Sequence, residues 1–290
     1  MPAAAEKATK EAPRGRAATI APGDRVVLVE PDTGYRYLIE VDAKGARKEK
    51  GLGVFDPQRL VGVAYGAPTQ VGAKHVVPLR PTLEDLSATV RRKAQVILPK
   101  DVSRIVHELG IGPGDHVLES GIGSGAATLA LAWAVGETGR VSVQELRPEF
   151  TEWAMDNLRR AGLDARVKAL EGDLTKGLAA GLRGPFQAVL LDQPEPWLGL
   201  PNVLPELDAG AHVAAYCPQV VQVEETVRTL RRLGFADVRA MELIERQWEV
   251  KERGSRPSFE GLGHTGFLVF ARWLGQPVPQ VPPAPGTGLA

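Results

Sequence analysis

Cysteine is nearly absent from this sequence, since Cys217 is the only one in 290 residues. A lone cysteine cannot form an intramolecular disulfide, and it excludes a metal site built from several cysteines. We therefore expect a cytoplasmic protein without a bound metal. Long apolar runs are also absent, because no stretch approaches the roughly 20 residues that span a bilayer. The first twenty residues lack the apolar segment of a secretory signal, which argues against export.

The sequence also has no net charge, because Lys and Arg number 35 and so do Asp and Glu. Neutrality by itself argues against a general binder of polyanions. The charges are nevertheless uneven: residues 1–100 contain 17 basic and 11 acidic side chains, and residues 101–290 contain 18 and 24. The front third is therefore the candidate phosphate-facing part. A solvated surface with a basic tail explains the same counts equally well.

Composition divides the chain into four segments. Residues 1–20 and the Pro/Gly-rich residues 276–290 are expected to be disordered tails. Residues 21–82 contain short apolar runs between Gly and Pro turns, which predicts a small β domain that serves packing or docking. Its expected strands are Val26–Glu30, Tyr35–Val41, Gly53–Phe55, Leu60–Val63 and Val76–Leu79.

Residues 83–275 alternate between strand-like and helix-like patterns, which is typical of a doubly wound α/β sheet. Two late strand-like stretches, Val238–Trp248 and Gly266–Trp273, have no clear helix between them and predict a closing antiparallel hairpin. The expected helices are Leu83–Val90, Val102–Leu109, Gly125–Val135, Pro148–Ala161 and Val220–Leu233. The other expected strands are His116–Glu119, Val141–Glu145, Val167–Glu171, Ala188–Asp192 and His212–Tyr216.

A glycine-rich loop, Gly121–Gly125, joins the first of these strands to the helix that follows. Its glycines permit positive φ angles and close approach of a ligand, and the helix N-terminus adds free N–H groups. The loop therefore predicts a nucleotide-like ligand. It formally matches the dinucleotide fingerprint, but its middle glycine and the preceding Glu119 fit S-adenosylmethionine better.

Two acids follow the next two strands. Glu145 ends the second strand, where a carboxylate accepts hydrogen bonds from ribose hydroxyls in either ligand class. Asp173 follows the third strand, where we expect it beside an adenine amino group. The alternative is a structural tight turn with two surface acids.

The fourth strand runs into Asp192-Gln193-Pro194-Glu195-Pro196-Trp197, the most specific feature of the sequence. Ligands bind beyond the carboxyl ends of such strands, so Asp192 should face the cofactor. Trp197 offers a surface on which a base can stack, or a wall for the pocket. Enzymes that methylate adenine nitrogens use an Asp–Pro–aromatic arrangement at this strand end, where the Asp carboxylate accepts a hydrogen bond from the exocyclic amino group. A purely structural proline turn is the weaker interpretation.

Together with these motifs, three further blocks resemble the tRNA (adenine-58-N1)-methyltransferases over roughly residues 20–275. The blocks are Pro78–Asp85, Arg92–Asp101 and His264–Arg272. The resemblance implies a small N-terminal β domain, a methyltransferase domain that uses S-adenosylmethionine, and a homotetramer that binds tRNA across subunits. The implied reaction is methylation of N1 of adenine 58 in the T-loop. That nitrogen is hidden in folded tRNA, so the base must be flipped out for in-line transfer.

The resemblance also implies roles for individual residues. Asp192 would be the catalytic or base-positioning residue. Cofactor binding would involve Gln95, Gly121, Ile122, Gly123, Ser124, Gly125, Glu145, Asp173, Leu174 and Asp192. Substrate binding would involve Leu98, Trp197, Gln222, Arg256 and His264, where His264 fits a structural histidine at a strand start equally well.

Three positions depart from the family pattern. Leu98 stands where Tyr or His is common, Gln193 where Leu or Met is common, and Gln219 where Thr is common. A ring at position 98 would help to stack the target base, so Leu98 changes that expectation. None of the three removes a group that methyl transfer needs.

Three alternative functions explain parts of the sequence. An NAD-dependent oxidoreductase accounts for the glycines and Glu145 but not for residues 192–197. A non-catalytic tRNA-binding subunit should have lost the glycine loop or Asp192, and both are intact. A methyltransferase that acts on another RNA or on a protein stays open, because the tRNA assignment comes from the resemblance.

Overall fold

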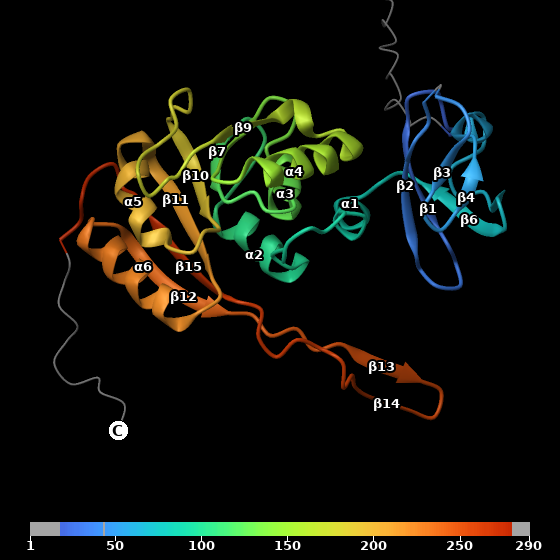
Figure 1. The fold of residues 1–290 in the computed structure, drawn as a ribbon. Helices are drawn as coiled ribbons and strands as arrows, with labels where there is room; N and C mark the ends of the chain where they lie inside the picture. Colours follow the sequence, from blue (N-terminus) through green and yellow to red (C-terminus); the bar gives the residue numbers. More distant parts are fainter. Residues whose placement is uncertain (1–17, 43, 280–290) are drawn as a thin grey trace, which may run out of the picture. The chain divides into compact units, whose positions relative to one another are not determined.

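The computed structural model of the protein describes residues 18–42 and 44–279. The chain divides into two compact units, of which one ends at Asp85 and the other begins at Leu86 (Figure 1). The boundary predicted after residue 82 lies close to this division. Most of the two tails predicted at 1–20 and 276–290 falls outside the described residues.

The innermost residues of both predicted tails are packed, which corrects the expected bounds of those tails. Ile20 is 2% exposed, and its N–H donates to the carbonyl of Val63 at 2.9 Å. The N–H of Val278 donates to the carbonyl of Gly234 at 2.8 Å. Composition did not reveal these contacts, because backbone hydrogen bonds to a neighbouring folded element do not depend on residue type.

The smaller unit is built on a four-stranded antiparallel sheet in the order β2-β1-β6-β5. The predicted strand at Leu60–Val63 is wrong, because Pro57–Leu60 form a 3-10 helix that Asp56 caps by accepting from the N–H of Gln58. Leu60 is apolar because it fills the core, at 1% exposure, and not because it lies in a strand. The strands are β1 (Arg25–Val29), β2 (Arg36–Glu40), β3 (Arg47–Glu49), β4 (Gly53–Phe55), β5 (Thr69–Val71) and β6 (Lys74–Leu79).

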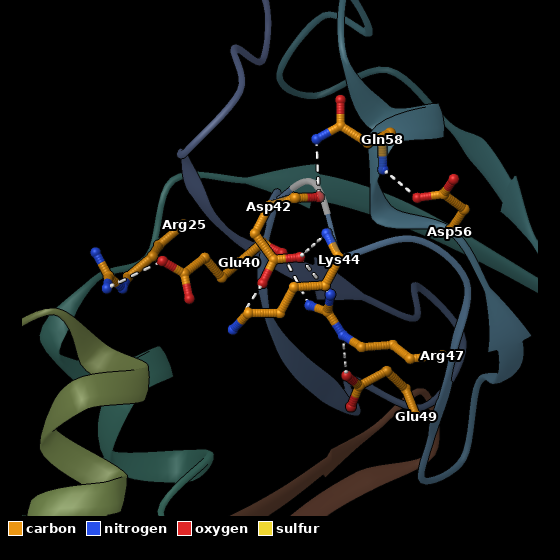
Figure 2. A network of polar contacts seen from close by, with 8 residues as sticks. All are labelled: Arg25, Glu40, Asp42, Lys44, Arg47, Glu49, Asp56 and Gln58. Atoms are coloured by element: carbon orange, nitrogen blue, oxygen red, sulfur yellow. Dashed lines mark hydrogen bonds and ion pairs between the residues drawn. The ribbon is translucent and has the colours of Figure 1, made fainter.

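Acidic and basic side chains are paired on this unit, as Figure 2 shows. Arg47 lies 2.6 Å from Asp42 and 3.0 Å from Glu49, and Arg25 lies 3.4 Å from Glu40. These pairs are partly buried but remain accessible to solvent, and ion pairs at a protein surface typically contribute about 0–1 kcal/mol each to stability. Pairing does, however, offset the positive charge of these side chains. A phosphate-facing surface on this unit would therefore depend on other basic residues.

The larger unit contains a seven-stranded sheet in the order β12-β15-β11-β10-β7-β8-β9. Strands β7 to β11 are parallel to one another, and β15 runs antiparallel to both β11 and β12. The doubly wound sheet with an antiparallel ending is thereby confirmed. Its strands are β7 (His116–Ser120), β8 (Arg140–Glu145), β9 (Val167–Glu171), β10 (Phe186–Leu191), β11 (Leu207–Cys217), β12 (Ala236–Glu242) and β15 (Phe267–Arg272).

The closing strands are not joined by a simple turn. The stretch expected to be one strand at Val238–Trp248 breaks after Glu242, and a separate two-stranded hairpin follows, formed by β13 (Trp248–Lys251) and β14 (Gly254–Pro257). Its side chains include Val250, which is 80% exposed, so the apolar residues here do not mark a buried strand.

Helix α3 contacts both α2 and α4, and α5 contacts α6. Helix α4 begins at Pro148 and ends before Gly162, whose φ of 73° terminates it. Helix α5 was not predicted, because its apolar sequence with an internal Pro201 has no helical periodicity. The helices are α1 (Leu83–Ala88), α2 (Pro99–Glu108), α3 (Ala126–Ala134), α4 (Pro148–Ala161), α5 (Pro196–Val203) and α6 (Val220–Arg232), with short 3-10 turns at Asp164–Arg166 and Leu204–Glu206. Among the described residues, no helix has the length and apolarity to cross a membrane.

His116, at the amino end of β7, is expected to make stability depend on pH. Its Nε2 lies 2.8 Å from the Ser142 hydroxyl, and its Nδ1 lies 3.1 Å from the Arg140 guanidinium, which can only donate. Burial and Arg140 lower the pKa of His116 to about 4, against 6.5 in an unfolded chain. The unfolded state therefore takes up the proton first as the pH falls. The stabilisation is complete above pH 6.5 and is lost progressively towards pH 4, by up to about 3 kcal/mol.

Urea unfolding of wild type and His116→Gln at several pH values measures this effect. All five tryptophans lie in the larger unit, so their fluorescence reports on its unfolding. We expect the wild type to lose more unfolding free energy than the variant between pH 6.5 and 4. Parallel pH profiles would show that His116 does not titrate as its surroundings require.

Candidate functional site

The glycine loop follows β7 and adopts positive φ angles of 87° at Gly121, 49° at Gly123 and 80° at Gly125. A β-carbon at Gly121 would lie 1.8 Å from the carbonyl oxygen of Asp192. The N–H of Asp192 also donates to the carbonyl of Ser120 at 2.8 Å. Gly121 therefore lets the residue after β10 approach the loop closely. Gly123, by contrast, faces open space.

Ser124 fixes a preceding segment of the chain onto this loop. Its buried hydroxyl accepts hydrogen bonds from the N–H groups of Lys93 and Ala94, at 3.0 and 3.1 Å. The next residue, Gln95, is exposed. The segment that contains Gln95 is thus held against the glycine loop by Ser124. The Ser124 hydroxyl oxygen accepts the two hydrogen bonds from Lys93 and Ala94 that hold it there.

The first cavity, of about 390 Å³, lies at the carboxyl ends of β7, β8, β9 and β10. Five residues predicted to bind a cofactor line it: Gly121, Glu145, Asp173, Leu174 and Asp192. The other predicted cofactor residues, Gln95, Ile122, Gly123, Ser124 and Gly125, are not part of its lining. The complete lining is Ser120, Gly121, Gln144, Glu145, Leu146, Arg147, Gly172, Asp173, Leu174, Thr175, Asp192, Gln193, Pro194 and Glu195.

Glu145 and Asp173 are held by their own neighbours in this cavity. Glu145 accepts from the N–H groups of Ile122 and Arg147, both at 2.9 Å. Asp173 accepts from the backbone N–H of Thr175, at 3.0 Å, and from its hydroxyl, at 2.6 Å. The Thr175 hydroxyl, followed by Lys176, lowers the pKa of Asp173. Both side chains are therefore oriented before any ligand binds.

Two carboxyl groups, Asp192 in the lining of this cavity and Glu119 near it, are costly to ionise because burial and neighbouring carboxyl groups disfavour their negative charge. Glu119 on β7 is fully buried, and neither of its oxygens makes a hydrogen bond of regular geometry among the described residues, although the nearby Thr128 hydroxyl partly offsets the rise of its pKa. Burial, and then Asp192 and Glu145, raise the pKa of Glu119 to about 8. Burial and Glu145 raise the pKa of Asp192 to about 7. A cationic ligand would relieve this crowding of carboxylates. The sequence singled out Glu119 only as part of the loop pattern, because its lack of a regular hydrogen bond is a property of the fold.

The second cavity, of about 450 Å³, lies between the start of α5 and the start of α6. It shares Asp192, Gln193 and Pro194 with the first cavity, and its other lining residues are Trp197, Pro218, Gln219, Val221 and Gln222. The structure therefore brings together three residues predicted for catalysis or substrate binding: Asp192, Trp197 and Gln222.

Gln222 is already engaged in the cavity wall. Its amide donates to the carbonyl of Pro194 at 2.8 Å and accepts from the N–H of Gln219 at 2.8 Å. Gln222 thus belongs to the capping box of α6, and its hydrogen bond to Pro194 holds the loop after β10 against the start of that helix.

Two other predicted substrate residues line neither cavity. Leu98 is the N-cap residue of α2. Arg256 on β14 pairs with Glu249 at 2.9 Å, and its guanidinium lies 4.3 Å from the Phe259 ring centroid.

His264 does not line the second cavity, but it contacts Pro218, which does. Its Nδ1 lies 2.6 Å from Glu242, and its Nε2 lies 3.0 Å from the carbonyl oxygen of Pro218, which lines that cavity. Both partners are acceptors, so both hydrogen bonds form together only when the ring is protonated. Glu242 and then Pro218 accordingly raise the pKa of His264.

One polar cluster near the site was not predicted to have a role. Lys100 Nζ donates to Asp101 at 2.7 Å, to the carbonyl of Leu243 at 2.7 Å and to the Thr265 hydroxyl at 2.8 Å. That hydroxyl donates to Asp101 at 2.8 Å, and Asp101 is fully buried. The sequence block Arg92–Asp101 contains two members, but their partners lie more than a hundred positions away. Within the described part of the chain, no group of three or more His, Cys, Asp or Glu is arranged to hold a metal ion.

A profile of the family described as the tRNA methyltransferase complex GCD14 subunit matches residues 74–256. The TrmI of Methanocaldococcus jannaschii, a tRNA (adenine(57)-N(1)/adenine(58)-N(1))-methyltransferase, is 31% identical over 282 residues, which cover 89% of this chain and 95% of that protein. The tRNA (adenine(58)-N(1))-methyltransferase TrmI of Thermus thermophilus is 38% identical over 195 residues, covering 67% of this chain and 76% of that protein.

Two solved structures are similar along most of the chain. A SAM-dependent O-methyltransferase from Thermotoga maritima aligns with a TM-score of 0.74 at 30% identity, covering 92% of this chain and 97% of its own. The tRNA (m1A58) methyltransferase TrmI from Aquifex aeolicus aligns with a TM-score of 0.68 at 28% identity, covering 88% of this chain and 98% of its own.

Proposed function

This chain belongs to the tRNA methyltransferase family of the GCD14 subunit and TrmI, and we propose that it methylates N1 of adenine 58 in tRNA with S-adenosylmethionine. The observation that carries the proposal is the pair of cavities that share Asp192, where Asp192 and the nearby Glu119 have raised pKa values and form no ion pair within the described part of the chain. One cavity suits a cationic cofactor, and the other suits a base with a polar edge.

The charge of the first cavity favours S-adenosylmethionine over a dinucleotide. S-adenosylmethionine carries a sulfonium and an ammonium group, and carboxylates at Asp192 and Glu145 in the cavity lining would stabilise this positive charge. The pyrophosphate of NAD would instead be repelled by those two carboxylates. Glu145 and Asp173 both line this cavity, and we expect Glu145 to accept hydrogen bonds from ribose hydroxyls and Asp173 to accept one from the adenine amino group. When bound, the cofactor supplies an electrophilic methyl group on its sulfonium.

The second cavity suits a flipped adenine. Trp197 supplies an aromatic wall, and the Asp192 carboxylate can accept a hydrogen bond from the exocyclic amino group. Adenine N1 has a free lone pair, so the reaction needs no strong base, and the task of the protein is orientation. Holding two reactants in line can lower a barrier by about 7–11 kcal/mol. Methylation makes the ring cationic, and the carboxylate of Asp192 stabilises that charge as it develops.

The proposal extends to the assembly and its location. On the family resemblance, the protein is a cytoplasmic homotetramer, and tRNA is bound across its subunits. Light scattering during gel filtration measures the mass of the assembly, and a mass of four chains of 31.1 kDa is expected.

A methyl-transfer assay tests the proposed reaction. Protein and labelled S-adenosylmethionine are incubated with unmodified tRNA, and the modified nucleoside and its position are identified. We expect 1-methyladenosine at position 58 and none in a tRNA with guanosine at that position. The mapping also shows whether adenine 57 is modified. We further expect S-adenosylmethionine, and not NAD, to raise the Tm. Cofactor binding without label in tRNA would point to another RNA or a protein as acceptor.

A further inference from the structure

The second cavity has a wall that does not come from the loop after β10. Pro218 forms part of this wall, and it follows Tyr216 at the end of β11. Two adjacent residues in the segment before β15 hold these positions. His264 contacts the carbonyl of Pro218, and the carbonyl of Thr265 accepts the Tyr216 hydroxyl. The position of Pro218 therefore depends on residues 264 and 265.

Thr265 is in turn held by the start of α2. Its hydroxyl accepts from Lys100 and donates to Asp101, so both of its hydrogen-bonding roles are used. Lys100 also reaches the carbonyl of Leu243, just after β12. Asp101 is fully buried, and the Lys100 side chain is 12% exposed. A buried, fully bonded network of this kind specifies one arrangement of the segments it joins.

The packing around Tyr216 agrees with this arrangement. A β-carbon at Gly266 would lie 2.5 Å from Cζ of the Tyr216 ring, so only glycine permits the ring to lie against this segment. Burial, together with the carboxyl groups of Asp101 and Asp192, raises the pKa of Tyr216 to about 12. The Tyr216 hydroxyl therefore lies within electrostatic reach of Asp101 in the buried network and of Asp192, which lines both cavities.

We propose that Lys100, Asp101 and Thr265 form a positioning network that, through Tyr216 at the end of β11, holds Pro218 in the wall of the second cavity in the arrangement that accepts the substrate base. The inference rests on the proposed function, because it assigns the target base to that cavity. The three residues do not touch the base, and they act through Tyr216, His264 and Pro218. Loosening the network lowers the fraction of protein that can bind the base, which raises KM for tRNA.

Thr265→Val tests the network with little change in shape. The variant removes the hydroxyl and leaves Lys100 and Asp101 each with one partner fewer. We expect KM for unmodified tRNA to rise roughly tenfold, while the Kd for S-adenosylmethionine is unchanged, because none of the three residues lines the first cavity. Thr265→Ser retains the hydroxyl and should restore KM to near the wild-type value.

Arg239→Met is the matched control. Arg239 on β12 forms an ion pair with Glu108, at the other end of α2. It therefore joins the same helix and strand region as Lys100, at a point that contacts neither cavity. We expect this variant to lower Tm but leave KM for tRNA unchanged. A KM that rises equally in both variants would show general loosening of α2 and overturn the inference.

A second readout does not depend on tRNA. The chain has five histidines, so NMR can follow the His264 ring, with His264→Gln for assignment. The groups around the ring are Glu242, the Pro218 carbonyl, Lys100 and the Phe267 ring. In Thr265→Val we expect the pKa of His264 to fall towards its ordinary value, and in Arg239→Met we expect no change. Wild type that does not methylate tRNA would refute the proposed function, while an unchanged His264 in Thr265→Val would refute the positioning network.

Discussion

Asp192→Asn is expected to lower kcat for tRNA methylation by roughly 10²–10³-fold while the protein still binds S-adenosylmethionine. The substitution keeps the size of the side chain but removes the charge. Adenine becomes cationic as N1 is methylated, so the lost carboxylate matters most in the transition state. Asp192 is the one acid shared by the linings of the two cavities, so on the proposed function it would contact both reactants. Single-turnover methylation and calorimetric titration of the cofactor separate the two effects.

Asp173→Asn is the control for this prediction. Asp173 follows β9, which is separated from β10 by two strands, and it lines the first cavity but not the second. Its loss should weaken cofactor binding and leave kcat at saturating cofactor nearly unchanged. If Asp192→Asn turned over tRNA as fast as wild type, Asp192 would have no part in the chemistry.

The same residue gives the reaction a pH dependence. Burial and Glu145 raise the pKa of Asp192 to about 7, so in the free protein the carboxyl group is largely neutral below pH 7 and charged above it. The value of kcat/KM should therefore fall as the pH drops through about 7, and this step should be absent in Asp192→Asn.

The sequence predicted the elements whose ends carry their own signals. Pro148 and Gly162 bracket an amphipathic run, and α4 occupies that run. The rule that ligands bind beyond strand ends also placed Asp192 and Trp197 at one cavity. Elements without a hydrophobic period or a cap signal were not predicted, as α5 shows. Leu60 was misassigned because apolar residues are common both in strands and at buried positions outside them.

The parts of the site that were missed depend on long-range pairing. Lys100 and Thr265 are 165 positions apart, and nothing in either local sequence indicates the other. The lack of a regular hydrogen bond to Glu119 is likewise visible only when every neighbour is placed. The glycine pattern predicted a ligand contact for Gly121, whereas the structure shows that its nearest constraint is the backbone of Asp192.

Gly121→Ala is therefore expected to disrupt both cavities. The new β-carbon would lie 1.8 Å from the carbonyl oxygen of Asp192, and the φ of 87° disfavours any side chain. Backbone strain of about 1–2 kcal/mol and overpacking of about 1–3 kcal/mol act together, so unfolding should become easier by roughly 3 kcal/mol. Since Asp192 must move, cofactor binding and methylation should both be lost.

Gly123→Ala separates this close approach from the general need for glycine in the loop. Gly123 also has a positive φ, of 49°, but a β-carbon there would meet no atom within 4 Å. This variant should lose only about 1 kcal/mol of stability from strain and still bind S-adenosylmethionine. Urea unfolding and calorimetric titration of the two variants provide the comparison. Equal losses in both would mean that the ligand, and not the backbone of Asp192, sets the requirement for glycine at position 121.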